Sequence, residues 1–183
     1  NNAAQSAGYA SVDNAWFLGG EDDIWFSYGY LGTQSEIVVP RYVMDYTNKN
    51  NPILRELDTF YSIVKDGLYQ DITKITLEEG YVQFGIGDEE LTPAVSGGGM
   101  NFVKEIVLPS TLTKLGMGAF AGLASLEKIN LEDTKLTTIS INAFVETINL
   151  KKIKLPETVK KIDAYAFYGA GLVELELNEG LIS

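Results

Sequence analysis

A six-residue pattern recurs four times in the second half of the chain, at spacings of 22 to 24 residues. Each copy reads apolar-x-x-apolar-x-apolar, and the copies lie at 103–108, 126–131, 150–155 and 172–177. Alternating apolar and polar residues over the last four positions are typical of a β-strand with one buried side. A repeat of this length predicts a solenoid in which each copy adds one short strand to a parallel sheet.

Each unit carries a second apolar signature after its strand. It begins with two apolar residues three positions apart, at Leu112 and Leu115, Leu136 and Ile139, and Val159 and Ile162. An Ala-Phe dipeptide follows, at Ala119-Phe120, Ala143-Phe144 and Ala166-Phe167. We expect the rings to fill the interior between coils, because the small residue before each ring lets the backbones approach. The other side chains expected in the core are Leu108, Ile129, Leu131, Ile153 and Leu155.

Weaker copies of the unit lie upstream. Residues 72–77 fit the strand pattern, and Tyr81 and Phe84 fit the apolar pair that follows it. Residues 36–40 match 105–109, and we expect Val43 and Tyr46 to be the apolar pair of this first unit. The unit at 72–77 holds an insertion of about eight residues that ends in the Gly-rich segment 96–99, and the first unit holds an insertion of about fifteen residues.

The inserted residues predict a helix at about 52–66. Asn51 suits the N-cap, Pro52 suits the first helical position, and Gly67 suits the end of the helix. The apolar residues between them follow a helical period: Ile53, Leu54, Leu57, Phe60, Tyr61 and Val64.

The first 33 residues are rich in aromatic side chains in turn-rich surroundings: Trp16, Phe17, Trp25, Phe26, Tyr28 and Tyr30. The end coil of a solenoid exposes its apolar interior and needs a cover, so we interpret this segment as a cap. We expect one continuous domain, with the cap and a divergent first repeat at 1–71 and the repeat array at 72–183. The expected fold class is an α/β-type solenoid of mostly strand and irregular structure, coiled right-handed by the crossover rule.

The repeat resembles the BspA-like class of leucine-rich repeats, whose pattern is Leu-x-x-Ile-x-Leu-Pro-x-x-Leu-x-x-Ile-x-x-x-Ala-Phe. Residues 150–167 match this pattern almost completely, and residues 103–120 match it well. The unit that begins at Leu126 departs from it by lacking the Pro and adding one residue. The resemblance implies a cell-surface or secreted protein, typical of host-associated bacteria, that serves in adhesion or other protein binding.

Composition excludes several classes of function. The chain has no Cys and no His, which removes disulfides, thiolate and imidazole metal sites, and Ser-His-Asp or Cys-His catalysis. A net charge of −11 disfavours nucleic acid and anionic membranes as partners. No apolar run reaches the ~18 residues of a membrane span. Paired carboxylates of the glycosidase type are compatible with the composition, but no pair stands out, so we expect neither catalysis nor a cofactor.

The register also predicts which side chains face outward from the sheet. Oppositely charged residues then become neighbours on adjacent strands, which leaves open either a charge ladder on a solvated face or a recognition face. The candidate binding residues on this face are Lys74, Glu105, Lys128, Asn130, Lys152, Lys154, Glu174 and Glu176.

Two further candidate sites lie in the aromatic segment and in a Gly-rich insertion. Trp16 and Trp25, with Asp22 and Asp23, have the ring and carboxylate chemistry of a glycan site, although such rings are more often the core of a cap. The acids at 88–90 are suited to Ca²⁺ by their oxygen ligands, but they lack the spacing of an EF-hand loop and are more often a solvated acidic loop. We therefore predict no metal site.

The sequence favours a non-enzymatic surface module that binds protein, with a structural spacer or a glycan-binding module as alternatives. The final strand at 172–177 is followed only by the beginning of another turn, up to Ser183. Such an edge predicts that the polypeptide continues or that the molecule self-associates there. The start, at 1–6, shows no charged and apolar leader pattern and is typical of the tail that remains after a leader is removed, or of a cloning boundary.

Overall fold

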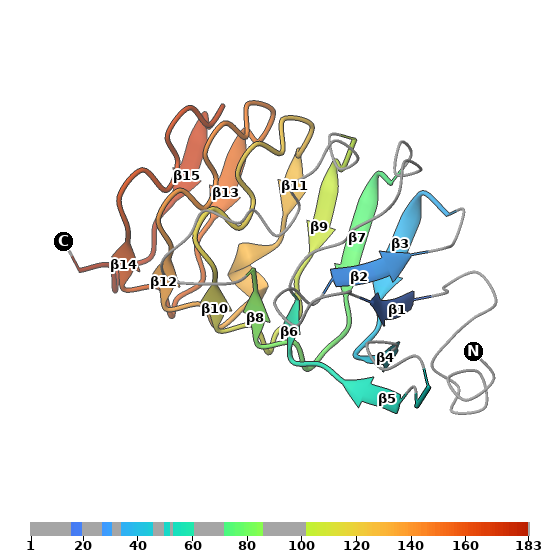
Figure 1. Ribbon diagram of the computed structural model, residues 1–183. Coiled ribbons are helices and arrows are strands. Elements are labelled where there is room, and N and C mark those ends of the chain that lie inside the picture. Colours follow the sequence, from blue (N-terminus) through green and yellow to red (C-terminus); the bar gives the residue numbers. More distant parts are fainter. Residues whose placement is uncertain are drawn as a thin grey trace.

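The computed structural model describes residues 16–19, 27–30, 34–45, 50–51, 53–60, 72–85 and 102–182. Within these ranges the protein consists of short strands joined by turns, with one short 3-10 helix. Successive coils stack side by side, so that two rows of strands run along the molecule (Figure 1). The strand predictions from the repeat are therefore confirmed.

The first row forms the main sheet, and all of its pairings are parallel. Four strands are hydrogen-bonded in the order β11-β9-β7-β3, and β13 and β15 form a separate pair at the C-terminal end. The strands of this row are β3 (Glu36–Val39), β7 (Lys74–Leu77), β9 (Glu105–Val107), β11 (Lys128–Ile129), β13 (Lys152–Lys154) and β15 (Glu174–Glu176). Each strand lies inside the six-residue segment that the repeat predicts.

The second row consists of the two-residue strands that contain the apolar pairs. It is divided into a sheet of order β10-β8-β6 and a pair β12-β14, both parallel. The strands are β6 (Thr59–Phe60), β8 (Gln83–Phe84), β10 (Lys114–Leu115), β12 (Thr138–Ile139) and β14 (Lys161–Ile162). The first row is interrupted between β11 and β13, and the second row between β10 and β12. Both interruptions involve the coil of β11 and β12, which is the unit with one extra residue.

The N-terminal segment contributes a third sheet, of order β2-β1-β4-β5. Its strands are β1 (Trp16–Gly19), β2 (Ser27–Tyr30), β4 (Tyr42–Asp45) and β5 (Ile53–Glu56). β1 runs antiparallel to β2 and parallel to β4, and β4 and β5 are antiparallel. Thus part of the aromatic segment pairs with the insertion of the first repeat, at the end of the molecule where β3 lies (Figure 1).

The predicted helix at 52–66 is wrong over the residues that the structure describes. Residues 53–60 form β5 and β6 instead, and Ile53 and Leu54 are exposed rather than packed along a helical stripe. Leu57 and Phe60 are buried, and their spacing of three is that of the repeat's apolar pair. The same spacing matches one turn of a helix, which explains the misinterpretation.

Leu57 and Phe60, rather than Val43 and Tyr46, therefore form the apolar pair of the first unit. Val43 is buried but belongs to β4, and Tyr46 lies outside the described residues. Arg41 closes the base of the insertion: its carbonyl accepts from the Leu57 N–H at 2.8 Å, and its Nε donates to the Leu57 carbonyl at 3.1 Å.

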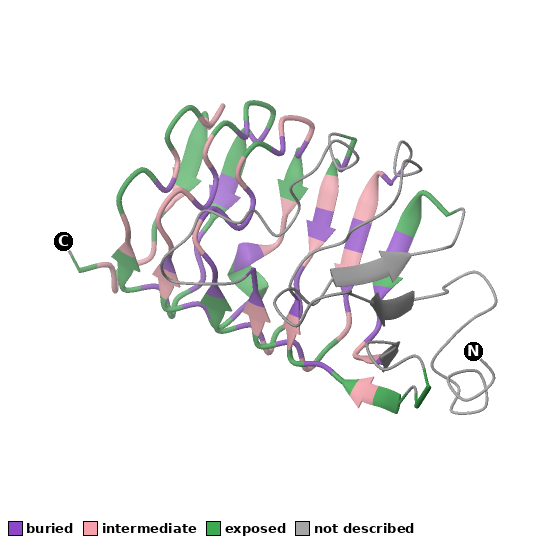
Figure 2. Cartoon of the chain, in the orientation of Figure 1, coloured by how far each residue is buried: buried purple, intermediate pink, exposed green. Residues whose placement is uncertain are grey.

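The core runs between the two rows of strands as one continuous apolar cluster (Figure 2). Of the side chains expected there, Leu108, Leu131, Ile153, Leu155, Phe120 and Phe144 are buried. Ile129 and Phe167 are only partly buried but pack against the cluster. Phe167 belongs to the last complete coil, so little packs against one side of its ring.

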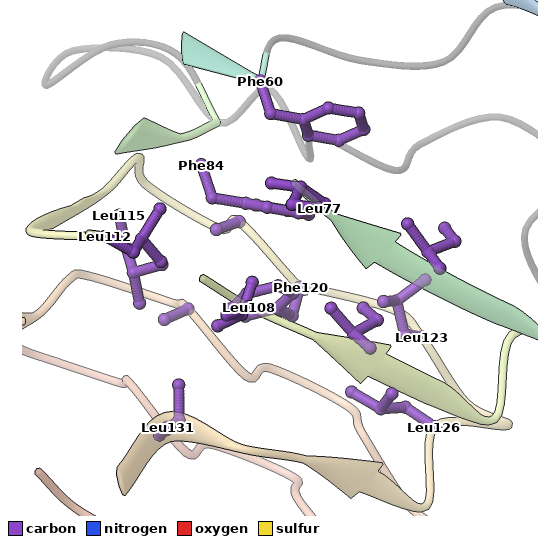
Figure 3. Close-up of a cluster of buried hydrophobic side chains, with 14 of the residues drawn as sticks. Phe60, Leu77, Phe84, Leu108, Leu112, Leu115, Phe120, Leu123, Leu126 and Leu131 are labelled. Carbon is purple, nitrogen blue, oxygen red and sulfur yellow. The ribbon is translucent and has the colours of Figure 1, made fainter. Parts of the chain in front are cut away.

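Phenylalanine rings from five coils form a continuous stack through the core. Centroid distances are 4.7 Å for Phe60–Phe84 and for Phe84–Phe120, 5.0 Å for Phe120–Phe144 and 5.4 Å for Phe144–Phe167. Figure 3 shows the first three of these rings, one from each successive coil. Such offset ring pairs stabilise the fold beyond the area that they bury.

Candidate functional site

The outward face of the main sheet carries the charge ladder that the register predicts. Lys74 lies opposite Glu105, which lies opposite Lys128, and Lys152 lies opposite Glu174. The Lys74 Nζ is 3.2 Å from the Glu105 carboxylate, and both side chains are about one-third exposed. Ion pairs of this kind stabilise a protein only modestly, because water already solvates both charges.

The C-terminal part of the ladder is a cluster of two lysines and two glutamates. The Lys152 Nζ lies 2.9 Å from Glu174 and 2.6 Å from Glu176, and the Lys154 Nζ lies 3.9 Å from Glu176. Hydrogen bonds to Glu176 and then Glu174 raise the pKa of Lys152. The hydrogen bond from Lys152 lowers the pKa of Glu176 in return, so this pair stays charged over a wide pH range.

Asn130 has a different role from its charged neighbours. The Leu108 N–H donates to the Asn130 Oδ1 at 2.7 Å, and the Asn130 Nδ2 donates to the Leu108 carbonyl at 3.1 Å. Its Nδ2 also donates at 3.0 Å to Asp133, the last residue of the 3-10 helix Leu131–Asp133. The side chain thus joins the coils of β9 and β11, which are paired in the main sheet, and most of its hydrogen-bonding capacity is used within the protein.

The structure brings the other predicted face residues together in two groups. Lys74, Glu105 and Lys128 belong to the four-stranded sheet, and the cluster of Lys152, Lys154, Glu174 and Glu176 belongs to the β13–β15 pair. For the predicted glycan site, Asp22, Asp23 and Trp25 lie outside the described residues. Trp16 is the first residue of β1, but the structure does not describe its side chain. The acids at 88–90 also lie outside.

Two exposed tyrosines lie in the turn after β14. The Tyr165 and Tyr168 side chains are 68% and 66% exposed, and their rings meet edge to face with centroids 6.1 Å apart. Tyr165 has φ of 57°, in the left-handed region, where earlier coils have Gly118 and Asn142. A bulky aromatic side chain is unusual at such a position, and strain of this kind points to a functional constraint.

The tyrosine pair has another exposed apolar side chain nearby. The Tyr168 carbonyl accepts from the Glu146 N–H at 2.9 Å, and two residues further along the chain lies Ile148, whose side chain is 52% exposed. These residues are not among the site residues predicted from the sequence. The sequence does contain a signal for them. Tyr165 occupies the position at which earlier coils have Gly118 and Asn142, and a second tyrosine, Tyr168, follows three residues later.

The C-terminal edge is open both in its backbone and in its side chains. In earlier turns, the N–H groups of Gly118 and Asn142 donate to carbonyls of the following coil. The corresponding N–H groups of Tyr165, Phe167 and Gly169 have no acceptor within the described ranges. Exposed apolar side chains accompany them, at Val173, Leu175, Leu177 and Ile182.

One short parallel strand per coil, a second row of apolar pairs and a continuous interior ring stack together define a leucine-rich repeat solenoid. Residues 99–183 match six copies of the family model described as "BspA type Leucine rich repeat region". This part of the chain is therefore a BspA-type leucine-rich repeat region.

A solved structure with a similar fold is that of a leucine rich cell surface protein from Faecalibacterium prausnitzii A2-165. The TM-score is 0.58 at 17% sequence identity, and the match covers 94% of this chain and 43% of that one. The chain thus spans less than half the length of that protein, and the likeness extends to the fold alone. No curated protein matches the sequence. The described part of the chain contains no helix with the length and apolar character needed to cross a bilayer.

Proposed function

We propose that this chain is a non-enzymatic binding module of a cell-surface or secreted protein, and that it binds protein partners. The BspA-type repeats at 99–183 and the fold shared with a leucine rich cell surface protein support the location. A solenoid of this kind offers extended surfaces on which contacts can accumulate over several coils.

The observation that carries the proposal is the exposed pair Tyr165 and Tyr168. Interface hot spots are enriched in tyrosine, because its ring gives a large contact area at low entropic cost and its hydroxyl can hydrogen-bond. In this pair two rings are already in contact, and Tyr165 keeps an unfavourable backbone conformation to present its ring. Ile148 extends the apolar surface on the neighbouring coil.

The charged face would contribute specificity rather than most of the affinity. Exposed ion pairs join Lys152 and Lys154 to Glu174 and Glu176. A partner of complementary charge can form ion pairs with these side chains in place of the internal ones. Lys74, Glu105 and Lys128 continue the alternation of charge toward the N-terminal coils.

Binding to a panel of purified host extracellular-matrix proteins, measured by biolayer interferometry, tests the proposal. A partner should bind the native chain, and a Tyr165→Ala, Tyr168→Ala double variant should weaken binding by tenfold or more, the level of an interface hot spot. Phe102→Ala is the matched control, since Phe102 is also an exposed aromatic side chain but lies outside this turn. Equal loss in both variants, or binding that neither variant changes, would contradict the proposed site.

A structural spacer is the second candidate, and the internal pairing of the charge ladder favours it. The lysines and glutamates of this face already form ion pairs with one another, so a partner gains little from pairing with them. The absence of binding to every protein of the panel, and to a glycan array, would support the spacer. Glycan binding through Trp16, Trp25, Asp22 and Asp23 stays a prediction that the same array tests.

A further inference from the structure

A groove lies between β10 and β12, in the gap that divides the second row of strands. Its volume is about 500 Å³, in the range of small-ligand sites. The lining includes side chains with hydroxyl or ammonium groups, from Thr113, Lys114, Lys135, Thr137, Thr138 and Ser140. These residues are separate from the tyrosine pair and from the charge ladder.

The groove lies between two hydrogen bonds that join the coils. The Lys135 N–H donates to the Leu112 carbonyl at 2.8 Å, and the Ser140 hydroxyl donates to the Gly116 carbonyl at 2.7 Å. Between these two bonds the strands are separated, and β10 and β12 belong to different sheets.

The separation leaves backbone groups on both walls without their regular partners. In the neighbouring pair of coils, the Lys160 N–H donates to the Thr137 carbonyl and the Asp163 N–H donates to the Ile139 carbonyl. The corresponding donors at β12 are the N–H groups of Thr137 and Ser140. The corresponding acceptors at β10 are the carbonyls of Thr113 and Leu115. None of these four groups has a protein partner within the described residues. Each can therefore bind a ligand in place of water.

The lining of the groove carries two lysines and one carboxylate in a chain whose net charge is −11. Lys114 and Lys135 line it, and the one carboxylate in the lining, Asp163, lies 2.6 Å from the Lys161 Nζ. Lys135 is exposed and has no ion pair among the described residues. A negatively charged group would therefore be attracted to this part of the surface.

We propose that this groove binds an acidic saccharide, with a carboxylate or sulfate group at Lys135 and sugar hydroxyls between the two walls. The anionic group accepts hydrogen bonds from the lysine. Sugar hydroxyls both donate and accept, so they can satisfy the Thr113 and Leu115 carbonyls on one wall and the Thr137 and Ser140 N–H groups on the other.

The two bonds that close the groove argue against an extended peptide. A strand inserted between β10 and β12 would need about 4.8 Å on each side along its whole length. The Lys135–Leu112 and Ser140–Gly116 hydrogen bonds hold the coils together at both ends of the groove. A compact ring that enters from the open side is compatible with them.

The test uses the full chain labelled with ¹⁵N and titrated with four disaccharides or ions: a heparin-derived sulfated disaccharide, digalacturonic acid, neutral maltose and sodium sulfate. At least one acidic disaccharide should shift the amide signals of Thr137 and Ser140, whereas maltose and sulfate should not. Which acidic probe binds identifies the anionic group. Lys135→Glu should weaken binding by about tenfold, as expected for the loss of one charge-assisted hydrogen bond.

Lys104→Glu is the matched control, because Lys104 is equally an exposed lysine but lies next to β9 of the main sheet, outside the groove. Its affinity for the acidic disaccharide should stay within twofold of the native value. The proposal is overturned if both variants lose affinity equally, if maltose or sulfate alone reproduces the shifts, or if the two amide signals do not move. It is equally overturned if an oligoglutamate peptide shifts them and no saccharide does.

Discussion

The rings of Phe120 and Phe144 stack with their centroids 5.0 Å apart and their planes inclined by 28°. Each ring is fully buried, and each has a further ring on its other face, Phe84 beyond Phe120 and Phe167 beyond Phe144. The stack thus connects the interior of each coil to the next, which in a solenoid is the main source of cooperativity.

Phe144→Ala should reduce the free energy of unfolding by about 3–5 kcal/mol, because the cavity removes ring contacts on both sides. Chemical denaturation followed by circular dichroism measures this. Phe102→Ala removes the same atoms from a side chain that is 50% exposed and should cost less than about 1 kcal/mol. Equal effects from the two variants would mean that the ring stack does not determine stability.

Asn130→Ala should also destabilise the protein, by about 1–3 kcal/mol, because it leaves the Leu108 N–H and carbonyl without the amide partner. Lys128→Ala, two residues earlier and exposed, should change stability by less than about 0.5 kcal/mol. If Asn130→Ala leaves the melting temperature unchanged and abolishes partner binding instead, the amide belongs to a recognition face and not to the joint between coils.

Deleting residues 1–33 should cause aggregation. β1 pairs with β4, so the deletion uncovers a strand edge at the N-terminal end of the solenoid. Light scattering and thermal melting of the truncated chain measure the effect. A soluble monomer with unchanged melting behaviour would refute the cap and favour the glycan-site interpretation of Trp16 and Trp25.

Self-association through the C-terminal edge should increase as pH falls. The acids at this edge, Glu174, Glu176 and Glu179, repel a second copy while they are charged. Lys152 lowers the pKa of Glu176, so its ion pair persists below the ordinary glutamate pKa and is lost only as pH falls through the lowered value. We therefore expect association mainly at pH values below the ordinary glutamate pKa.

Sedimentation velocity from about pH 7 to pH 3.5 measures that association. Leu177→Lys is the control, because it places a charge on an exposed apolar side chain of the same edge and should keep the protein monomeric. A native chain that stays monomeric at every pH would show that this edge needs no cover. Equal association of the native and variant chains would show that self-association does not use this edge.

The repeat spacing was sufficient to predict the strands and their register. Lys74 lies opposite Glu105, and Lys152 opposite Glu174, because adjacent coils of nearly constant length bring equivalent positions together. Spacing is misleading in the first unit, where the apolar residues of 53–60 follow a helical period but form β5 and β6. There the insertion lies between the strand and its apolar pair, and spacing alone does not show where an insertion begins.

By itself, the sequence determined the features that repeat: the parallel strands, the buried leucines and phenylalanines, and the alternating charges of the main sheet. These follow from local periodicity, because a buried position in one coil is buried in the next. Only the tertiary structure decided the features that depend on how two particular coils meet. Phe84, which pairs in register with Leu115, nevertheless joins the stack beside Phe120. Asn130 faces back to Leu108, and a groove lies between β10 and β12. Each of these depends on the distance between chain segments more than twenty residues apart, which no local pattern records.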